Sequence, residues 1–228
     1  MRVAFDKGPY YANKGDFNTA GFAAFSTRKR LESNLFKVEG GQFGTFRTVG
    51  LFNLLEPKTT KDPSLYSATE YFRTDGYFES SQNFNRFNTL LKYHQRLSDN
   101  KTIELSTSAF TSSWDASGQI PLRAIQSGQI SRFGAIDDTE GGNTSRVNLN
   151  AKLTTDLSDG GIIENQVFMS KYDFKLVSNF TFFLNDPING DQITQSEDRQ
   201  IYGSNNSYWN NWSLFGLKAS TEFGTGFR

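Results

Sequence analysis

The sequence predicts an all-β fold, an up-and-down antiparallel transmembrane β-barrel of which about nine strands are present. Three observations lead to this prediction. In residues 147–153 every odd position is apolar and every even position is polar, which is the period of a strand with one apolar face. Similar segments recur along most of the chain. The connections between them alternate between short and long.

The first strands are expected shortly after residue 30. Alternation starts at Phe36 and Val38, and a glycine-rich turn follows at 40–44. The return strand runs to about Leu55, and a connection with two prolines leads to the next strand at 65–74. These segments predict a hairpin followed by a third antiparallel strand.

The remaining strands follow the same pattern. They are expected at 87–97, 103–109, 147–153, 168–176, 199–208 and 217–223. Short turns are expected at 98–101, 158–161 and 209–216, and long irregular segments at 75–85, 114–146 and 178–197. Successive connections of an up-and-down sheet lie at opposite ends. All the long loops therefore lie at one end, as in outer-membrane barrels.

The composition fits a membrane barrel and excludes several other classes. Aromatic residues make up 15% of the chain although hydrophobic residues reach only 36%, which is typical of β-proteins with aromatic residues at interfaces. The zero net charge gives no reason to expect a nucleic-acid partner. The lack of Cys excludes disulfides and thiolate metal sites. No apolar run is long enough for a transmembrane helix, whereas barrel strands are only half apolar.

Aromatic girdles are expected at both membrane interfaces of such a barrel. Trp209 and Trp212 fall near a short turn, and Trp114 falls where a strand enters a long loop. Packing in a core is the alternative for each of them. The N-terminus has no apolar run typical of a signal peptide. The chain is therefore expected either to be cytosolic or to lack the true start of its gene.

Several segments resemble those of TonB-dependent outer-membrane receptors. Asp-Lys-Gly-Pro-Tyr at 6–10, Gly-Asp-Phe at 15–17 and Ala-Gly at 20–21 resemble the end of the plug domain of that family. Glu-Gly-Gly-Gln-Phe-Gly-Thr at 39–45 resembles the hairpin that opens the barrel. Segments 117–121 and 134–142 resemble loops of a Bacteroidetes-type branch. Through order and spacing, the resemblance covers essentially the whole chain.

The resemblance implies a receptor in the cell outer membrane of a Gram-negative bacterium, with a plug inside a barrel of about 22 strands. Residues 1–30 are then the C-terminal part of the plug domain, and residues 31–228 are the N-terminal part of the barrel. Such a receptor takes up a scarce ligand of the siderophore, cobalamin, glycan or peptide class. The TonB complex supplies the energy through parts that this chain lacks, so the chain is expected to be an internal fragment.

The resemblance also implies which partners and activities to expect. The expected partners are outer-membrane lipid and an extracellular small ligand or oligomer, with no nucleic acid. We expect neither enzymatic activity nor a cofactor, because the single histidine, His94, lacks the partners that a triad or metal site needs. Acidic residues in loops can bind calcium. For Asp137, Asp138 and Glu140 a solvated loop is the alternative, and segment 186–191 lacks the terminal Glu of a calcium loop. No metal site is therefore predicted.

The candidate ligand-binding residues are loop aromatics and neighbouring polar residues, because exposed aromatic faces bind sugars, peptides and hydrophobic chelates. The alternative is that these loops only pack on one another. The candidates are Tyr77, Phe78, Trp114, Asp115, Arg123, Arg132, Asp137, Asp138 and Glu140, with Phe180, Phe182 and Phe183 as further aromatics. The 114–146 loop is expected to supply part of the site and to contain a short helix at 121–130, from Pro121 to Gly128.

A function from a different class is a soluble, secreted β-sheet protein that binds glycans through a flat aromatic face. The sorting of long loops to one end favours the membrane receptor, because Greek-key sandwiches have no reason to sort their loops. Dependence on detergent distinguishes the two. The identity of the ligand does not follow from the fold, because function is set in the loops.

Overall fold

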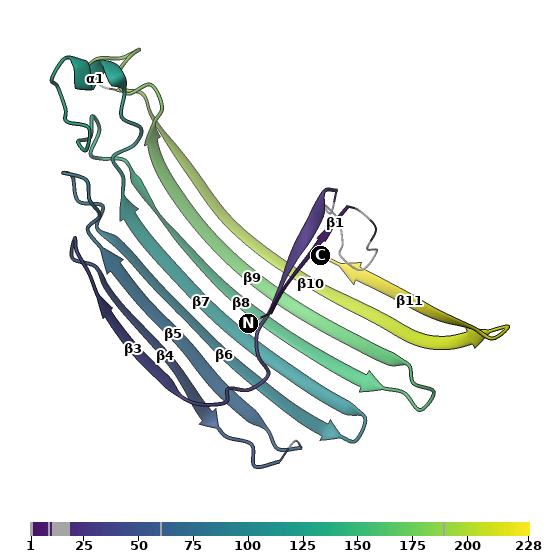
Figure 1. Ribbon diagram of the computed structural model, residues 1–228. Helices are drawn as coiled ribbons and strands as arrows, with labels where there is room; N and C mark the ends of the chain where they lie inside the picture. Colours follow the sequence, from purple (N-terminus) through teal and green to yellow (C-terminus); the bar gives the residue numbers. More distant parts are fainter. Residues whose placement is uncertain (1, 9, 11–18, 60, 189) are drawn as a thin grey trace.

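The computed structural model describes residues 2–8, 10, 19–59, 61–188 and 190–228. Pro9 and the 15–17 motif lie outside these residues. The described chain forms β1 (Arg2–Lys7), β2 (Gly21–Ser26), β3 (Leu35–Gly40), β4 (Phe46–Leu55), β5 (Ser64–Thr74), β6 (Phe84–Ser98), β7 (Lys101–Asp115), α1 (Leu122–Gln126), β8 (Gly141–Asp156), β9 (Ile162–Asn179), β10 (Gln192–Leu214) and β11 (Leu217–Phe227) (Figure 1). Among these elements, no helix is long and apolar enough to span a membrane.

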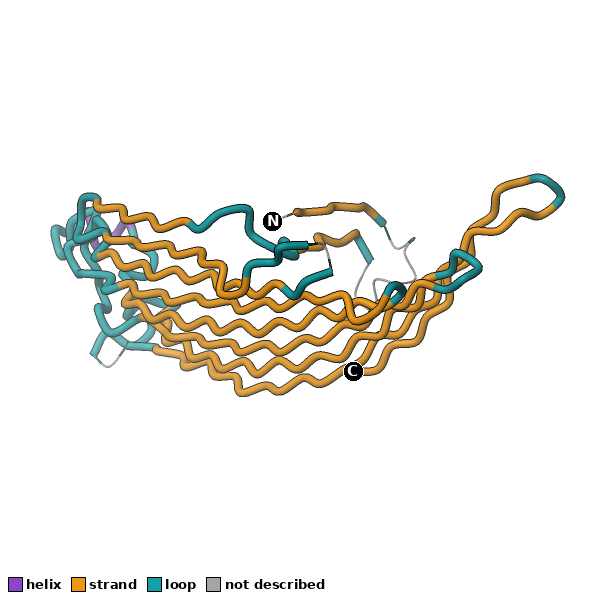
Figure 2. The backbone as a smooth tube through the Cα atoms, turned by 90° about the horizontal axis from the view of Figure 1, so that it is seen from below, coloured by secondary structure: helices purple, strands orange, loops and turns teal. Residues whose placement is uncertain are grey.

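Nine strands form one antiparallel sheet whose order follows the sequence from β3 at one edge to β11 at the other. Each strand pairs with the strands before and after it in the chain, without a crossover. The sheet is strongly curved, and Figure 2 shows it as a trough. This arrangement confirms the prediction of an all-β, up-and-down sheet with about nine strands, as in the wall of a barrel.

The connections sort to the two ends of the sheet as predicted. The loops at 75–83, 116–140 and 180–191 lie at one end, together with the tight turn at 41–45. The turns at 56–63, 99–100, 157–161 and 215–216 lie at the other end. We call these the loop end and the turn end. The predicted helix is present in shorter form as α1, with Pro121 at its N-cap and Gly128, at a φ of +74°, just beyond its C-terminus.

Several strands are longer than the alternation predicted. The irregular segment expected at 114–146 covers only 116–140, because β7 continues to Asp115 and β8 already begins at Gly141. Likewise β10 spans Gln192–Leu214, so the connection predicted at 209–216 is wrong and only Phe215 and Gly216 form the turn. In a membrane barrel, a strand end beyond the apolar layer needs no apolar residues on either face, so its sequence need not alternate.

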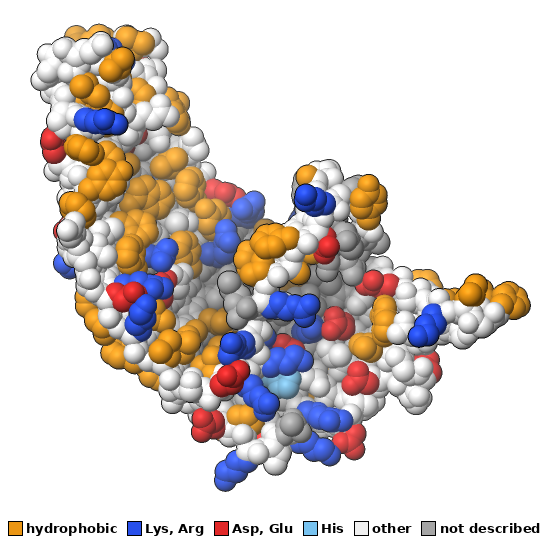
Figure 3. Space-filling model, in the orientation of Figure 1, with side chains coloured by type: hydrophobic (Ala, Val, Ile, Leu, Met, Phe, Trp, Pro, Cys, Tyr) orange, Lys and Arg blue, Asp and Glu red, His pale blue; other side chains and the backbone are white. Residues whose placement is uncertain are grey.

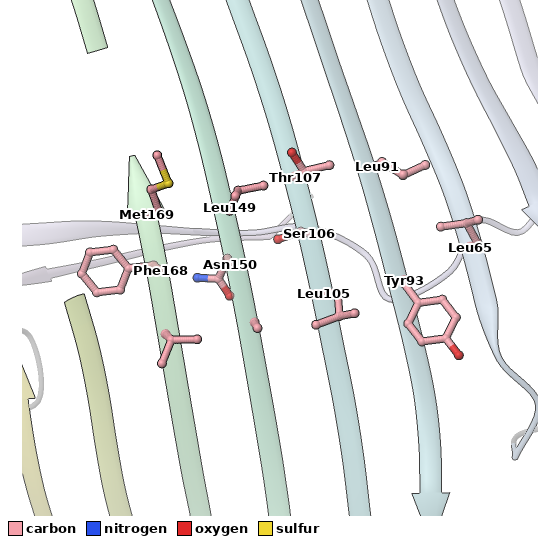
Figure 4. Close-up of a pocket in the computed structure, with 12 residues that line it drawn as sticks. Leu65, Leu91, Tyr93, Leu105, Ser106, Thr107, Leu149, Asn150, Phe168 and Met169 are labelled. Carbon is pink, nitrogen blue, oxygen red and sulfur yellow. The ribbon is translucent and has the colours of Figure 1, made fainter. Parts of the chain in front are cut away.

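The two faces of the sheet differ in chemistry. On the concave face Asn148 donates to Ser108 Oγ (3.0 Å) and accepts from Ser170 Oγ (2.9 Å). On the convex face the neighbouring residue of β8, Leu149, remains 48% exposed. Leu149 lines an apolar groove of about 520 Å³ together with Leu65, Leu91, Leu105 and Met169 (Figure 4). The convex face therefore suits contact with lipid tails.

Residues 27–34 join β2 to β3 and contact the concave face; we call this segment the linker. The hairpin strands β1 and β2 pair only with each other and lie on the hollow side of the sheet (Figures 1 and 2). Tyr66, only 3% exposed, donates its hydroxyl to the carbonyl of Arg28 (2.8 Å). Glu104 forms ion pairs with Lys92 (3.0 Å) and Lys29 (3.3 Å). The linker is thus anchored near the turn end of β5–β7, and the assignment of residues 1–30 to a plug stays a prediction.

The contrast between the faces predicts opposite sensitivities to charge at neighbouring positions of β8. Leu149→Arg should cost about 2–4 kcal/mol of folding free energy in a bilayer, because it places a cation on the convex surface, which we expect to face lipid. Asn150→Arg should cost far less, because that side chain lies on the polar concave face. The measurement is folding into lipid bilayers of the whole protein that carries this chain. Equal losses for the two variants would show that the convex face does not contact lipid.

Candidate functional site

A pocket opens on the concave face, just beneath the long loops. It has a volume of about 630 Å³ and lies between β5, β6, β7 and the start of β8. Its aromatic walls are Phe72, Phe84, Phe110 and Trp114, and polar side chains complete the lining: Thr74, Gln82, Arg86, Ser112, Asp115 and Thr144. Figure 3 shows this face, with hydrophobic side chains gathered toward the loop end and charged ones around the linker.

The register of the strands brings these aromatic residues together. Phe72 and Phe84 meet edge to face with 5.6 Å between ring centroids. Trp114 lies opposite Gly142 in the β7–β8 ladder, and a Cβ atom at Gly142 would come within 2.8 Å of the indole. Glycine at this position therefore lets the indole pack directly against the backbone of β8. The pocket wall depends on this close approach.

Arg86 places one guanidinium among the aromatic rings. Its Cζ lies 5.5 Å from the ring centroid of Phe72, within the range of a cation–π interaction. Its NH2 donates to Glu70 (3.1 Å), which also accepts a hydrogen bond from Arg47 (2.7 Å). The Nε atom of Arg86 is buried and has no hydrogen-bond partner in the described part of the chain. A buried donor without an acceptor is unfavourable, so an acceptor bound there would be stabilised.

Two of the predicted site residues line this pocket, and both lie at the end of β7 rather than in the loop. Trp114 forms part of its aromatic wall. Asp115 lies at its rim and accepts a hydrogen bond from Asn83 (2.7 Å). The other aromatic residues of the wall, and Arg86, were missed by sequence reasoning. Phe72, Phe84 and Phe110 sit at concave-facing strand positions, where a polar residue is expected, and this departure is the signal that would find them.

The predicted aromatics of the 75–83 loop pack against other loops. Tyr77 stacks on Phe78 with 4.6 Å between centroids. The Tyr77 ring also lies edge to face with Phe133, at 6.0 Å between centroids, and with Phe43 of the β3–β4 turn, at 6.5 Å. The structure therefore shows the loop packing that was the alternative to ligand contact. Tyr77 remains 58% exposed, so its ring still offers a surface at the loop end.

The predicted polar residues mostly hold the 116–140 loop against the 180–191 loop. Arg123 donates to the carbonyls of Thr181 (3.3 Å) and Phe182. Asn179, fully buried, donates to Asp137 (3.0 Å) and accepts from the Phe182 amide (2.9 Å). Sequence reasoning missed Asn179, because an asparagine at a strand end has no distinctive pattern. Among the other predicted residues, Arg132, Asp138 and Phe180 are exposed, whereas Phe182 and Phe183 are partly buried.

Asp137 and Glu140 are both buried, but their pKa values shift in opposite directions. Burial raises the pKa of Asp137, but hydrogen bonds from Thr139, Asn179 and Gln192 outweigh burial and hold it below its ordinary value. Burial raises the pKa of Glu140, and the neighbouring charge of Asp137 adds to this, although the amide of Asn179 opposes it. The Oε1 atom of Glu140 has no hydrogen-bond partner in the described residues. The surroundings of Asp137 thus favour its charged form, whereas those of Glu140 disfavour it.

No cluster of three or more metal-ligating side chains occurs within the described ranges. In segment 186–191, where Asn189 lies outside the described residues, Asp186 accepts from the Ile188 amide (3.1 Å), and Asp191 accepts from the Asp186 amide (3.3 Å). These carboxylates therefore stabilise their own turn. His94 lies on β6, paired with Ser64 and Glu104 in the ladders, far along the strand from the pocket.

The comparisons with known proteins agree with the fold. The sequence matches no known family model and no curated protein. A chain of the solved FpvAI–pyocin S2 complex, a complex of a TonB-dependent receptor, is similar in structure with a TM-score of 0.67. The match covers 91% of this chain at 12% identity and spans 30% of the other chain. At this identity the likeness shows the fold alone.

The contrast between Asp137 and Glu140 predicts opposite effects of neutralising them. The raised pKa of Glu140 means that its stabilising contribution is present at low pH and is lost as the pH rises through the folded-state value. Glu140→Gln should therefore stabilise the loop at neutral pH. The lowered pKa of Asp137 means that its contribution is present above the ordinary value of 3.8 and lost as the pH falls.

Asp137→Asn should cost about 1–3 kcal/mol, because it replaces one of the two accepting carboxylate oxygens with an NH2 group that faces donors. The measurement is hydrogen exchange of the 116–140 backbone amides at neutral pH in the whole protein. The expected result is slower exchange for Glu140→Gln and faster exchange for Asp137→Asn. Faster exchange in both variants would mean that the charge of Glu140 does not destabilise the loop.

Proposed function

We propose that this chain is part of an outer-membrane receptor of the TonB-dependent kind. The receptor takes up a scarce ligand from outside the cell, and the TonB complex supplies the energy through parts outside this chain. The observation that carries the proposal is a curved up-and-down sheet with an apolar convex face, a polar concave face and all its long loops at one end. The likeness to a chain of the FpvAI–pyocin S2 complex supports the fold on which it rests.

In this proposal the loop end faces the outside of the cell and the turn end faces the periplasm. Residues 1–30 are the C-terminal part of the plug, and residues 31–228 are the N-terminal part of the barrel. Further strands pair with β3 and β11, which are the edges of the nine-stranded sheet. The linker, anchored by Tyr66 and Glu104 near the turn end, then joins the plug to the inner wall of the barrel.

The pocket under the loops is the proposed place of ligand capture. It faces the barrel interior, and its rim residue Asp115 connects through Asn83 to the 75–83 loop. A ligand that passes the loops reaches aromatic walls and the unsatisfied Nε of Arg86 before it reaches the linker. The class of ligand among siderophores, cobalamin, glycans and peptides is set by the loops and by this pocket.

The convex face argues against the soluble glycan-binding alternative. A protein in water would expose Leu149, Val147 and Val167, each between 45% and 58% exposed, on neighbouring strands. Apolar patches of this kind on soluble proteins are covered by a partner or cause aggregation. In a membrane the same residues contact lipid tails, so the receptor accounts for both faces of the sheet.

The first test of the proposed function is location. The whole protein that carries this chain, produced in a Gram-negative host, should sediment with the outer membrane. Only detergent, and not high salt, should release it, because lipid contact rather than charge holds a barrel in the membrane. Recovery in the soluble periplasmic fraction or in the culture medium would contradict the proposal.

The second test uses the isolated 228 residues. They should remain in solution only with detergent, because the edges of β3 and β11 present unpaired backbone groups and the convex face is apolar. The measurement is size-exclusion chromatography and denaturant unfolding with and without detergent. A compact monomer in plain buffer that unfolds cooperatively would instead indicate a soluble β-protein.

A further inference from the structure

We propose that the concave face between β6 and β10 binds a ligand that combines a flat ring with an anionic oxygen group, such as a carboxylate. This inference rests on the proposed function and specifies the ligand of the same site. The surface that carries it extends the pocket across the sheet, and we call it the aromatic–arginine wall. Its members are Arg86, Phe110, Trp114, Arg146, Tyr172 and Arg199.

Cross-strand pairing makes this wall continuous with the pocket. Phe110, a pocket wall residue on β7, lies directly opposite Arg146 on β8. Arg146 lies opposite Tyr172 on β9, which lies opposite Arg199 on β10. Directly opposed residues of an antiparallel sheet point to the same face, so all four side chains are on the concave surface. Aromatic rings and guanidinium groups therefore alternate from strand to strand.

Two guanidinium groups of the wall, those of Arg146 and Arg199, lie over the ring of Tyr172. The Cζ of Arg146 is 4.7 Å from the centroid of Tyr172, and that of Arg199 is 5.7 Å from it. Tyr172 also stacks on Phe174, at 6.3 Å and an interplanar angle of 12°. A guanidinium held over an aromatic ring keeps the N–H donors at its edge available, and on Arg146 no carboxylate of the described residues takes them up. A ring-shaped ligand can continue the same stack.

The charges on the wall are only partly compensated. Arg86 pairs with Glu70 (3.1 Å), and Arg199 pairs with Glu197 (2.9 Å). Arg146 has no carboxylate within ion-pair distance in the described part of the chain, and its contact is the ring of Tyr172. Among the described residues, the exposed guanidinium of Arg146 thus lacks a carboxylate partner, and the buried Nε of Arg86 lacks an acceptor. Their chemical complement is an anionic oxygen group.

Two ligand sources share this chemistry. An aromatic acid presents a planar ring and a carboxylate, and an acidic sugar presents the flat face of a pyranose ring and a carboxylate. Both stack on indole and phenol rings, and both give a guanidinium a two-oxygen acceptor. A neutral ring would use the aromatic walls but leave Arg146 unmatched. The presence of the carboxylate is therefore the property to test.

The experiment uses the whole protein that carries this chain, in detergent, and a matched pair of probes. Phenyl β-glucuronide and phenyl β-glucoside have the same two rings and differ in the carboxylate. Their affinities are measured by saturation-transfer NMR titration. The glucuronide should bind about tenfold more tightly, because a charge-assisted bidentate contact to guanidinium is worth that much. Competition by benzoate or by glucuronate then tells which ring the site prefers, and either result supports the proposal.

Substitutions test whether the preference for the glucuronide depends on the aromatic–arginine wall. Arg146→Gln should abolish the preference for the glucuronide, and Arg146→Lys, which keeps the charge but loses the planar pair of donors, should retain only part of it. The control is Lys152→Gln, which removes a cation of the same face and strand that is already paired with Glu164 (3.0 Å). This control should leave the preference unchanged.

The proposal is overturned if the glucoside binds as tightly as the glucuronide, if Arg146→Gln keeps the preference, or if neither probe binds. These outcomes leave the receptor function standing, because the location of the protein in the outer membrane is measured separately. A protein outside the outer membrane would instead overturn the proposed function.

Discussion

Cross-strand backbone pairing is the constraint on which the rest of this structure depends. Within an apolar layer each N–H and C=O must find a partner, and the nine antiparallel strands satisfy these groups in continuous ladders between β3 and β11. The ladders also fix which side chains share a face. A slip of one residue between β8 and β9 would exchange Leu149 for Asn150 on the convex surface, so register and the separation of the two faces are set together.

The same constraint explains which parts of the fold could be predicted from sequence. The central parts of the strands alternate clearly, as 147–153 does, and the number, order and loop sorting of the strands follow from that pattern. The strand ends could not be predicted, because segments such as 194–198 of β10 are polar on both faces. The pocket residues could not be predicted for a different reason. Phe72, Phe84 and Phe110 come from three strands, and only the register brings them together.

The loop candidates show what residue chemistry alone can and cannot identify. Tyr77, Arg123 and Asp137 are the aromatic and charged residues that a binding site would use, yet the structure engages each of them in loop packing. A sequence shows that a side chain is able to bind, but not whether a neighbouring loop already occupies it. Trp114 is different, because its partner is the backbone at Gly142 and its ring still lines a cavity.

The two ends of the concave face differ in whether their polar side chains have hydrogen-bond or ion-pair partners. Near the turn end Lys92, only 8% exposed, and Glu104 are matched by each other and by the linker, so this part of the wall serves as an anchor. Near the loop end, among the described residues, Arg86 keeps a buried donor without an acceptor, and Arg146 contacts the Tyr172 ring but no carboxylate. Polar groups that a chain satisfies internally hold its structure, whereas unmatched ones beside a cavity are available to a bound molecule. The half of the trough near the loop end is therefore where polar groups of the described residues lie unmatched beside a cavity.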